Sequence, residues 1–253
     1  MYINLSGLNV LVTGASRGIG KAVATKLAEA GATIAIHYNK NVREAENLAH
    51  VLGNDSSVFQ ADLSTHDGVI KLFEQVVGRY GSLEILVNNA GIAQSATIDS
   101  ADEEWLSVWD ETVNVNMKAS ALLCKKAVGH FLSRKASGRI INITSRASHR
   151  GDTPEYLAYA ASKAGMASLT KTLARAYGKQ GIKAFNVAPG FVRTDMAKSI
   201  ISQYGEDIAL KDLSLERLTE PKDIAPLVTF LASGMADHST GSTFDLNAGS
   251  YVR

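Results

Sequence analysis

The chain of 253 residues has little cysteine, little proline and no excess of one charge. Its single cysteine, Cys124, excludes an internal disulfide framework and indicates a reducing compartment; a buried position on a helix is its most natural place. Four prolines and 45% hydrophobic residues fit a packed globular domain. Lys and Arg number 26 against 25 Asp and Glu, without runs of one sign, so we expect no nucleic-acid partner.

Segments typical of membrane insertion or of metal binding are also missing from the sequence. The N-terminal MYINLSGLNVLVTGAS has no basic region ahead of an apolar one. No apolar run approaches the roughly 20 residues that a membrane span needs. The six histidines do not pair at metal-ligand spacing with one another or with Cys124, which argues against a zinc site. We therefore expect a cytoplasmic protein that acts on small molecules, with no membrane, nucleic-acid or metal partner.

Short β-branched runs alternate with segments of helical periodicity along the whole chain. The runs are LNVLVTG, ATIAIHY, SSVFQAD, LEILVNNAG, RIINITS, IKAFNVAPG and STFDLNAG. Helices are predicted at residues 18–30, 41–52, 66–80, 102–112, 113–135, 158–180 and 221–233. This alternation predicts one doubly wound α/β domain over residues 1–253, with a seven-stranded parallel sheet and helices on both faces.

The least regular part of the chain is the segment from about 191 to 220. Ligands bind outside the carboxyl ends of the strands in doubly wound sheets, so this segment is predicted to be a substrate flap. Pro221 is predicted to begin the helix that follows.

A glycine-rich turn joins the first predicted strand to the first helix. In VLVTGASRGIGKAV, Gly14, Gly18 and Gly20 follow the pattern G-x3-G-x-G. Glycines permit a tight turn and close backbone approach, and the N-terminus of a helix attracts a pyrophosphate. Because a strand precedes the turn and a helix follows it, a dinucleotide site is favoured over a turn that serves only chain reversal.

The end of the second predicted strand favours NADP(H) over NAD(H). Folds that bind NAD carry an acidic residue there, which binds the 2′-hydroxyl of the ribose. Residues 35–43 read AIHYNKNVR, with no carboxylate and with Lys40 and Arg43, and Arg17 adds a cation in the glycine turn. These cations would bind a 2′-phosphate. The alternative is that Arg17 and Lys40 are ordinary solvated charges.

Tyr159 and Lys163 lie four residues apart on a predicted helix and therefore project from one face. A phenol has an unperturbed pKa near 10, and an adjacent ammonium group favours the phenolate. Lowering the pKa of the tyrosine by about 3 units takes roughly 4 kcal/mol, which a partly desolvated lysine and a positively charged nicotinamide would supply together. Tyrosine-x3-lysine is common by chance, so its weight comes from its surroundings.

Five motifs occur in a characteristic order: TGASRGIG, NNAG at 88–91, ITS ending at Ser145, YAASK at 159–163 and PGFVRT at 189–194. With them, the whole chain resembles the classical short-chain dehydrogenase/reductase family. The resemblance implies a Rossmann-type domain and a homotetramer in which the two long helices, here about 113–135 and 158–180, pack across subunits.

The resemblance also implies roles for four residues of a catalytic set. Tyr159 would be the general acid that protonates the carbonyl oxygen, and Lys163 would lower its pKa and bind the nicotinamide ribose. Ser145 would hold the carbonyl or the developing alkoxide. Asn116, in NVNMK, would shape the active-site helix and position a relay water.

Cofactor positions follow from the glycine turn and from the same resemblance. Asp62 would meet the adenine ring, and Asn88 would lie under the adenosine, although Asn88 and Asn89 are also interpreted, in part, as buried amides that stabilise strand ends. The predicted cofactor-binding residues are Gly14, Ser16, Arg17, Gly18, Ile19, Gly20, Tyr38, Asn39, Lys40, Asp62, Leu63, Asn88, Ala90, Gly91, Tyr159, Lys163, Pro189, Gly190, Val192 and Thr194.

The loop RASHRGDTPEY, which follows Ser145, is predicted to line the substrate cleft. The predicted substrate-binding residues are Ser145, Arg146, His149, Arg150 and Tyr156. Arg146, His149 and Arg150 would bind a carboxylate or a phosphate. An equal alternative is that they pair with Asp152 and Glu155 or face water. For Tyr156, packing is favoured over a place in the pocket wall.

Two enzyme hypotheses and one binding hypothesis are compatible with these features. The leading hypothesis is NADP(H)-dependent reduction of a small polar carbonyl compound, for example an anionic sugar acid or oxo acid, or the reverse oxidation. The alternative is a 3-oxoacyl-(acyl-carrier-protein) reductase; the two arginines by which such reductases dock their carrier correspond here to Ala136 and Gln180, each beside a lysine. A non-catalytic dinucleotide-binding regulator is disfavoured, because the catalytic set is intact.

Trp105 and Trp109 are four residues apart on the helix predicted after NNAG. Helix packing is their default interpretation, and a pocket or a subunit edge is the alternative.

Overall fold

The seven predicted strands form one parallel sheet at the centre of the protein. In the computed structural model, which describes residues 3–197, 201 and 210–252, the strand order is β3-β2-β1-β4-β5-β6-β7. The strands are β1 (Asn9–Val12), β2 (Thr33–Tyr38), β3 (Ser57–Gln60), β4 (Ile85–Asn88), β5 (Gly138–Ile143), β6 (Ile182–Pro189) and β7 (Thr243–Leu246). This order confirms the doubly wound Rossmann-type fold.

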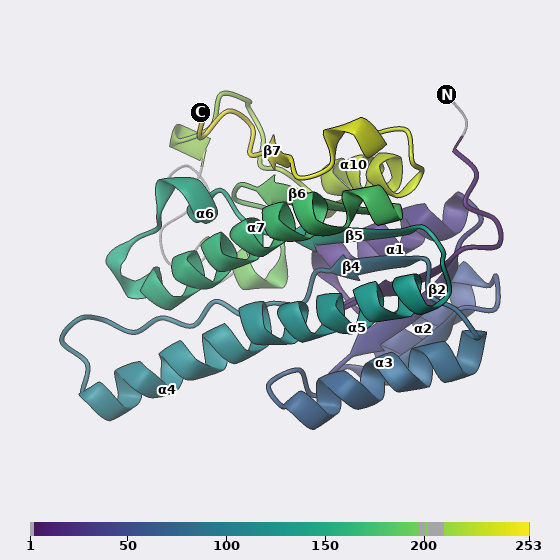
Figure 1. The fold of residues 1–253 in the computed structure, drawn as a ribbon. Helices are drawn as coiled ribbons and strands as arrows, with labels where there is room; N and C mark the ends of the chain where they lie inside the picture. The colour runs from purple at the N-terminus through teal and green to yellow at the C-terminus, as the bar shows by residue number, and fades with distance from the viewer. Residues whose placement is uncertain (1–2, 198–200, 202–209, 253) are drawn as a thin grey trace.

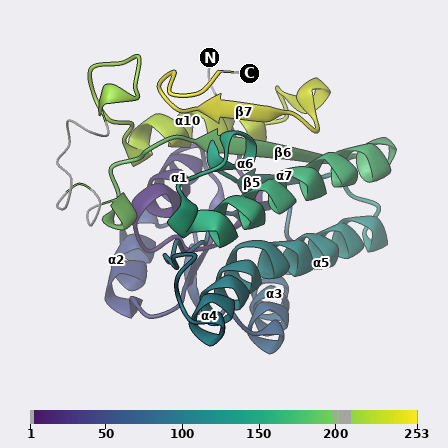
Figure 2. The same cartoon turned by 90° about the vertical axis from the view of Figure 1, so that its left-hand side faces the viewer.

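Helices cover both faces of the sheet (Figure 1, Figure 2). One apolar cluster lies under each layer of helices. The first cluster lies under α1 (Gly18–Glu29), α2 (Val42–Leu52) and α10 (Pro221–Ala232). The second lies under α3 (His66–Tyr80), α5 (Ala119–Ser133) and α7 (Leu157–Tyr177). Strands buried on both sides explain why the predicted runs are almost continuously apolar.

The two helices predicted at 102–112 and 113–135 are one continuous helical run. α4 (Asp102–Val113) passes into α5 through a π-helical turn, Asn114–Lys118, which contains Asn116. The extra residue that a π turn inserts shifts the face on which the following side chains lie, and such turns are frequent at functional sites. No periodicity in the sequence marks it.

Both ends of α7 and the start of α10 agree with the sequence prediction within a few residues. Short helical turns flank α7, at Pro154–Tyr156 before it and Gly178–Gln180 after it, and Asp237–Ser239 forms another before β7. Pro221 occupies the first turn of α10, as predicted. The four-residue helix α6 (Ala147–Arg150) follows β5. Much of the predicted flap, residues 198–200 and 202–209, lies outside the described residues.

Candidate active site at the carboxyl edge of the sheet

The predicted site residues gather where the strands end, because parallel strands place their carboxyl ends at one edge of the sheet. The strand order changes direction at β1 and β4, the switch point at which such folds bind ligands. The segments that meet at this edge are 13–20 after β1, 37–40 at the end of β2, 61–63 after β3, 88–91 after β4, 144–150 after β5 and 189–194 after β6.

At its glycine positions, the turn after β1 packs so closely against neighbouring atoms that side chains have little room. Gly14 has φ +64°, a left-handed conformation that favours glycine. A Cβ at Gly20 would overlap the carbonyl oxygen of Gly14. A Cβ at Gly18 would lie 3.5 Å from Cγ2 of Thr194, so the turn faces the segment after β6. The turn thus has the bare backbone surface that a pyrophosphate needs at the start of α1.

Side chains of two neighbouring strands hold this turn in place. The Nδ2 of Asn89 donates to the carbonyl oxygens of Thr13 and Gly14, at 2.8 and 3.2 Å. The Oγ1 of Thr13 accepts from the amides of Asn89 and Ala90, both at 2.9 Å. For Asn89, the interpretation as a stabilising amide is therefore correct.

Asn88 points away from this edge into the core. Its Nδ2 donates to Oδ1 of Asn142 at 2.8 Å and lies 3.3 Å from Sγ of Cys124. With the residue 1% exposed, only its backbone can face a bound cofactor, so the structure restricts the predicted contact to the main chain. Cys124 is buried on a helix as expected, and burial raises the pKa of its thiol to about 12.

Cations lie at the rim where the adenosine end of a dinucleotide would lie. The side chain of Arg17 is 63% exposed, 3.5 Å from Asp195. Asn39 and Lys40 are exposed, and Tyr38 is half-buried.

Asp62, after β3, is the predicted adenine contact, and its pKa is lowered, chiefly by hydrogen bonds from Ser64 and also by the charge of Lys40. Of the other predicted residues here, Ser16 and Leu63 are buried and Ile19 is half-buried.

Asn116 and Lys163 meet beside Gly91. Asn116 is fully buried: its Oδ1 accepts from the amide of Ile92 at 2.8 Å, and its Nδ2 donates to the carbonyl of Ile92 and to Oγ of Ser162. The Nζ of Lys163 donates to the carbonyl of Ile143 at 2.9 Å, and a Cβ at Gly91 would lie 3.3 Å from it. The π turn and the end of β5 thus fix both residues.

Ser145 and Tyr159 are the other two members of the predicted catalytic set. The amide of Ala147 donates to Oγ of Ser145 at 3.1 Å, which fixes the serine at the end of β5. Burial raises the pKa of Tyr159 and a hydrogen bond with Ser145 opposes this rise. The Nζ of Lys163 lies 5.9 Å from the centroid of the tyrosine ring.

The expected lowering of the tyrosine's pKa is not produced by the protein's own groups. Burial lowers the pKa of Lys163 to about 8, since the same desolvation that raises the pKa of the phenol disfavours the ammonium. Tyr159 is therefore a protonated phenol at neutral pH, which suits proton donation. The ionisation needed for the reverse reaction requires positive charge beyond that of Lys163.

The loop after Ser145 carries an ion-pair network that the sequence analysis missed. Arg146 and Arg150 both donate to Oδ2 of Asp212, at 2.7 and 2.8 Å. Burial lowers the pKa of Arg146, as does the charge of Arg150, whereas Asp212 and Asp152 oppose this. The expected partner Asp152 therefore acts only at longer range, and no ion pair to Glu155 is found among the described residues.

Asp212 lies in the least regular segment of the chain, so no local pattern marks it as the partner of this loop. His149 and Tyr156, the other predicted substrate residues, are half-buried in the same loop.

The nicotinamide-side segment joins this loop through the backbone. The amide of Arg146 donates to the carbonyl of Pro189, and the amide of Gly190 donates to that of Leu246. Val192 forms an isolated bridge with Thr219, and Thr194 lies opposite Gly18 as described above. The four predicted residues of this segment therefore lie between the glycine turn and the loop after Ser145.

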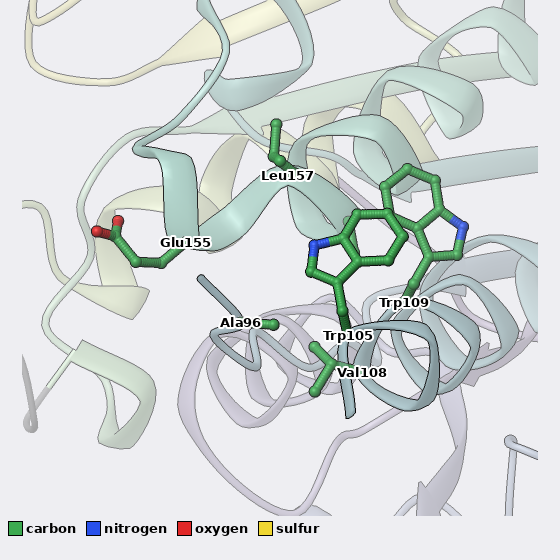
Figure 3. A pocket seen from close by; sticks show the side chains of 7 residues that line it. Ala96, Trp105, Val108, Trp109, Glu155 and Leu157 are labelled. Carbon is green, nitrogen blue, oxygen red and sulfur yellow. The ribbon is translucent and has the colours of Figure 1, made fainter. Parts of the chain in front are cut away.

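Trp105 and Trp109 stack on each other, with ring centroids 5.0 Å apart and planes at 21°. They line a pocket together with Glu155 and with the first two residues of α7, Leu157 and Ala158. Figure 3 shows the two rings side by side in this pocket. Helix packing and a place in a pocket, the two interpretations offered by the sequence, both apply to this pair.

The residues present fit a dinucleotide, because the glycines of the turn expose backbone at a helix N-terminus and because Lys163 and Asn116 lie nearby, beside Gly91. The comparisons with known proteins agree with this geometry. The family model described as enoyl-(acyl carrier protein) reductase matches residues 14–250. The chain belongs to the classical short-chain dehydrogenase/reductase family. Members of this family are NAD(P)-dependent oxidoreductases, and so is this chain.

Three short-chain dehydrogenase/reductase relatives illustrate the similarity. The 3-oxoacyl-(acyl-carrier-protein) reductase FabG of Staphylococcus epidermidis is 38% identical, over 96% of this chain and 99% of its own. A short-chain dehydrogenase of Burkholderia cenocepacia, solved with NADP, is 32% identical with a TM-score of 0.89, over 98% of this chain and 99% of its own. A candidate gluconate dehydrogenase of Agrobacterium tumefaciens is 27% identical with a TM-score of 0.91, over the full length of both chains.

No helix in residues 3–197, 201 and 210–252 is long and apolar enough to cross a membrane. Within the same residues, no group of three or more His, Cys, Asp or Glu side chains is placed to hold a metal ion.

Proposed function

We propose that this protein is an NADPH-dependent reductase of 3-oxoacyl thioesters. The observation that carries the proposal is the 38% identity to a 3-oxoacyl-(acyl-carrier-protein) reductase over nearly the whole of both chains. The predicted catalytic set, Asn116, Ser145, Tyr159 and Lys163, is complete at one edge of the sheet. The comparisons therefore favour the alternative of the sequence analysis over its leading hypothesis.

Each residue of the catalytic set has a separate task in this proposal. The hydroxyl of Ser145 donates to the carbonyl oxygen and stabilises the negative charge that develops there. Tyr159 gives its phenol proton to that oxygen. When bound, NADPH supplies the hydride that adds to the carbonyl carbon. Lys163 would bind the nicotinamide ribose, and its ammonium group would stabilise the phenolate that Tyr159 becomes, while Asn116 holds the backbone of Ile92 beside it.

The preference for NADP(H) rests on charge at the adenosine end. Arg17 is exposed in the glycine turn and Lys40 is exposed after β2, and residues 35–43 contain no carboxylate. A 2′-phosphate gains charge-assisted hydrogen bonds there, whereas a free 2′-hydroxyl finds no acidic acceptor. The relative solved with NADP is consistent with this preference.

A second candidate, reduction of a small anionic carbonyl compound, is favoured by one observation. Arg146, which directly follows Ser145 in the chain, and Arg150 converge on a single carboxylate oxygen, so the same pair would bind the carboxylate of an oxo acid or sugar acid in competition with Asp212. Arg150→Ala should then raise KM for acidic substrates and leave KM for neutral ones unchanged. Equal effects on both would remove this candidate.

A substrate panel separates the two candidates. NADPH oxidation is followed with a 3-oxoacyl carrier-protein thioester, the same acyl group on coenzyme A, oxo acids and oxidised sugar acids. We expect kcat/KM for the thioesters to exceed that for the acids by about tenfold or more. Higher kcat/KM for the acids would overturn the main proposal. Tight NADPH binding without turnover of any compound would instead indicate a regulator.

The oligomeric state and the location of the protein remain predictions that can be tested by measurement. A homotetramer is expected, and size-exclusion chromatography with light scattering measures its mass directly. A cytoplasmic location is expected from the low cysteine content, and cell fractionation tests it.

A further inference from the structure

One buried histidine at the carboxyl edge of the sheet is not used by the proposed mechanism. His37 lies near the end of β2 and is 2% exposed. Its ring lies between the glycine turn after β1 and the end of β3. Buried histidines are commonly core residues with satisfied hydrogen bonds, so what matters is which groups this ring holds.

Both ring nitrogens of His37 bind backbone groups of segments predicted to contact the cofactor. The amide of Gly14 donates to Nδ1 at 3.0 Å, and Nε2 lies 3.2 Å from the carbonyl oxygen of Ala61, the residue before Asp62. The backbone carbonyl of His37 also accepts from the amide of Ala15 at 2.9 Å.

These partners determine the protonation state of the ring. An amide can only donate, so Nδ1 carries no proton, and a carbonyl can only accept, so Nε2 carries one. The ring is therefore the neutral Nε2–H tautomer. Burial lowers the pKa of His37 to about 4, with the bond to Ala61 opposing this, which keeps the ring neutral under ordinary conditions.

The ring completes the support of the Gly14 backbone. Asn89 holds the carbonyl oxygen of Gly14, and His37 holds its amide, so both polar groups of this left-handed residue are fixed by side chains from neighbouring strands. Through Ala61 the same ring ties the turn to the segment that carries Asp62. Two parts of the cofactor site on either side of β2 are thereby kept at a fixed separation.

We propose that His37 is a positioning residue for the dinucleotide, which sets the glycine turn and the adenine-side segment in their binding geometry. This inference rests on the proposed dinucleotide site at Gly14. A histidine that only fills the core would affect stability alone. A positioning residue also changes cofactor affinity, because a misplaced turn must be reordered when the cofactor binds.

Three substitutions separate the two hydrogen bonds of the ring. His37→Asn places an amide oxygen near the position of Nδ1 and keeps an acceptor for Gly14. His37→Gln places an amide nitrogen near Nε2 and keeps a donor for Ala61, but leaves the amide of Gly14 without its acceptor. His37→Leu removes both bonds. If His37→Leu does not fold, comparing His37→Asn with His37→Gln still shows whether losing the acceptor for the Gly14 amide weakens cofactor binding.

A matched control is available at the opposite edge of the sheet. The Nε2 of His130, on α5, accepts from the amide of Leu83 at 3.1 Å, ahead of β4. His130→Leu also removes a side-chain acceptor from a backbone amide, but far from the glycine turn. It should lower the midpoint of urea unfolding and leave the Kd for NADPH unchanged.

The experiment measures Kd for NADPH by fluorescence titration of the full-length protein at neutral pH, with urea unfolding measured in parallel. We expect Kd to rise about tenfold or more for His37→Gln and His37→Leu, and about threefold or less for His37→Asn. KM for NADPH should follow Kd, while kcat at saturating NADPH stays within about twofold of wild type.

Two results from the His37 variants would overturn the inference. One is a Kd unchanged from wild type in all folded His37 variants, and the other is a larger loss of affinity for Asn than for Gln. A wild-type protein that binds neither NADPH nor NADH would contradict the dinucleotide site itself and the inference with it. Binding of NADPH without reduction of any thioester would affect only the proposed function.

Discussion

The neutral, buried state of His37 predicts a pH-dependent difference in stability that can be measured without any ligand. The residue is 2% exposed, and burial lowers its pKa from 6.5 to about 4. The unfolded chain therefore binds a proton at a pH where the folded protein does not. Its contribution to stability is complete above the unfolded pKa of 6.5 and is lost as the pH falls toward about 4.

The size of the effect follows from the two pKa values. A shift of this size corresponds to about 3 kcal/mol at a pH below both values, and about 2 kcal/mol is already lost at about pH 5. Carboxylates titrate over the same range, so the wild-type profile alone is ambiguous. His37→Asn removes only the imidazole, and the difference between the two proteins isolates its contribution.

The assay is urea unfolding, followed by the fluorescence of the two tryptophans, at one fixed protein concentration between about pH 7.5 and about pH 5. The wild type should lose about 2 kcal/mol more than His37→Asn over this range, so the stability gap between them narrows. If the difference in free energy of unfolding between wild type and His37→Asn stays constant within about 0.5 kcal/mol over this pH range, the conclusion that His37 is buried in its neutral form is refuted.

Three further predictions concern the catalytic and cofactor residues. Tyr159→Phe should reduce kcat by about 10³-fold and change the Kd for NADPH far less, because the proton donor is lost while the ring stays in place; steady-state rates within about tenfold of wild type would contradict its assigned task. Gly20→Ala should raise the Kd for NADPH by more than about tenfold, because the new Cβ overlaps the carbonyl of Gly14. The control is Gly78→Ala, whose Cβ has no atom nearby; it should leave the Kd unchanged and raise the free energy of unfolding by about 0.5–1 kcal/mol. Arg17→Glu should weaken NADPH much more than NADH in parallel titrations; equal weakening would show that Arg17 does not contact the 2′-phosphate.

Most of the fold was predictable because its signals are local. Seven β-branched runs became the seven strands, and the helices between them agree with their predicted ranges within a few residues. The glycine turn and the Tyr159–Lys163 spacing also depend only on neighbouring residues, and the order of the motifs is visible along the sequence. The π turn around Asn116 was missed, because a single inserted residue within a helix leaves the apolar periodicity almost unchanged.

The environment of the catalytic pair was only partly predictable. The sequence places Lys163 one helical turn from Tyr159, which is correct. It does not reveal how deeply the helix face is buried, and burial sets the direction of both pKa shifts: upward for the phenol and down to about 8 for the ammonium. The predicted lowering of the tyrosine pKa depends on a bound nicotinamide as well as on Lys163, so it stays a prediction for the complex with the cofactor.

The sequence by itself determined the type of fold, the family and the positions of the residues proposed for catalysis. Only the tertiary structure decided which distant groups meet: Gly14 with His37, 23 positions apart, Asn88 with Cys124, 36 apart, and Arg150 with Asp212, 62 apart. The physical reason is that hydropathy and spacing report contacts within a strand or a helical turn, whereas these pairs depend on the path of the whole chain through the sheet. That path makes a histidine in an apolar strand a support of the glycine turn.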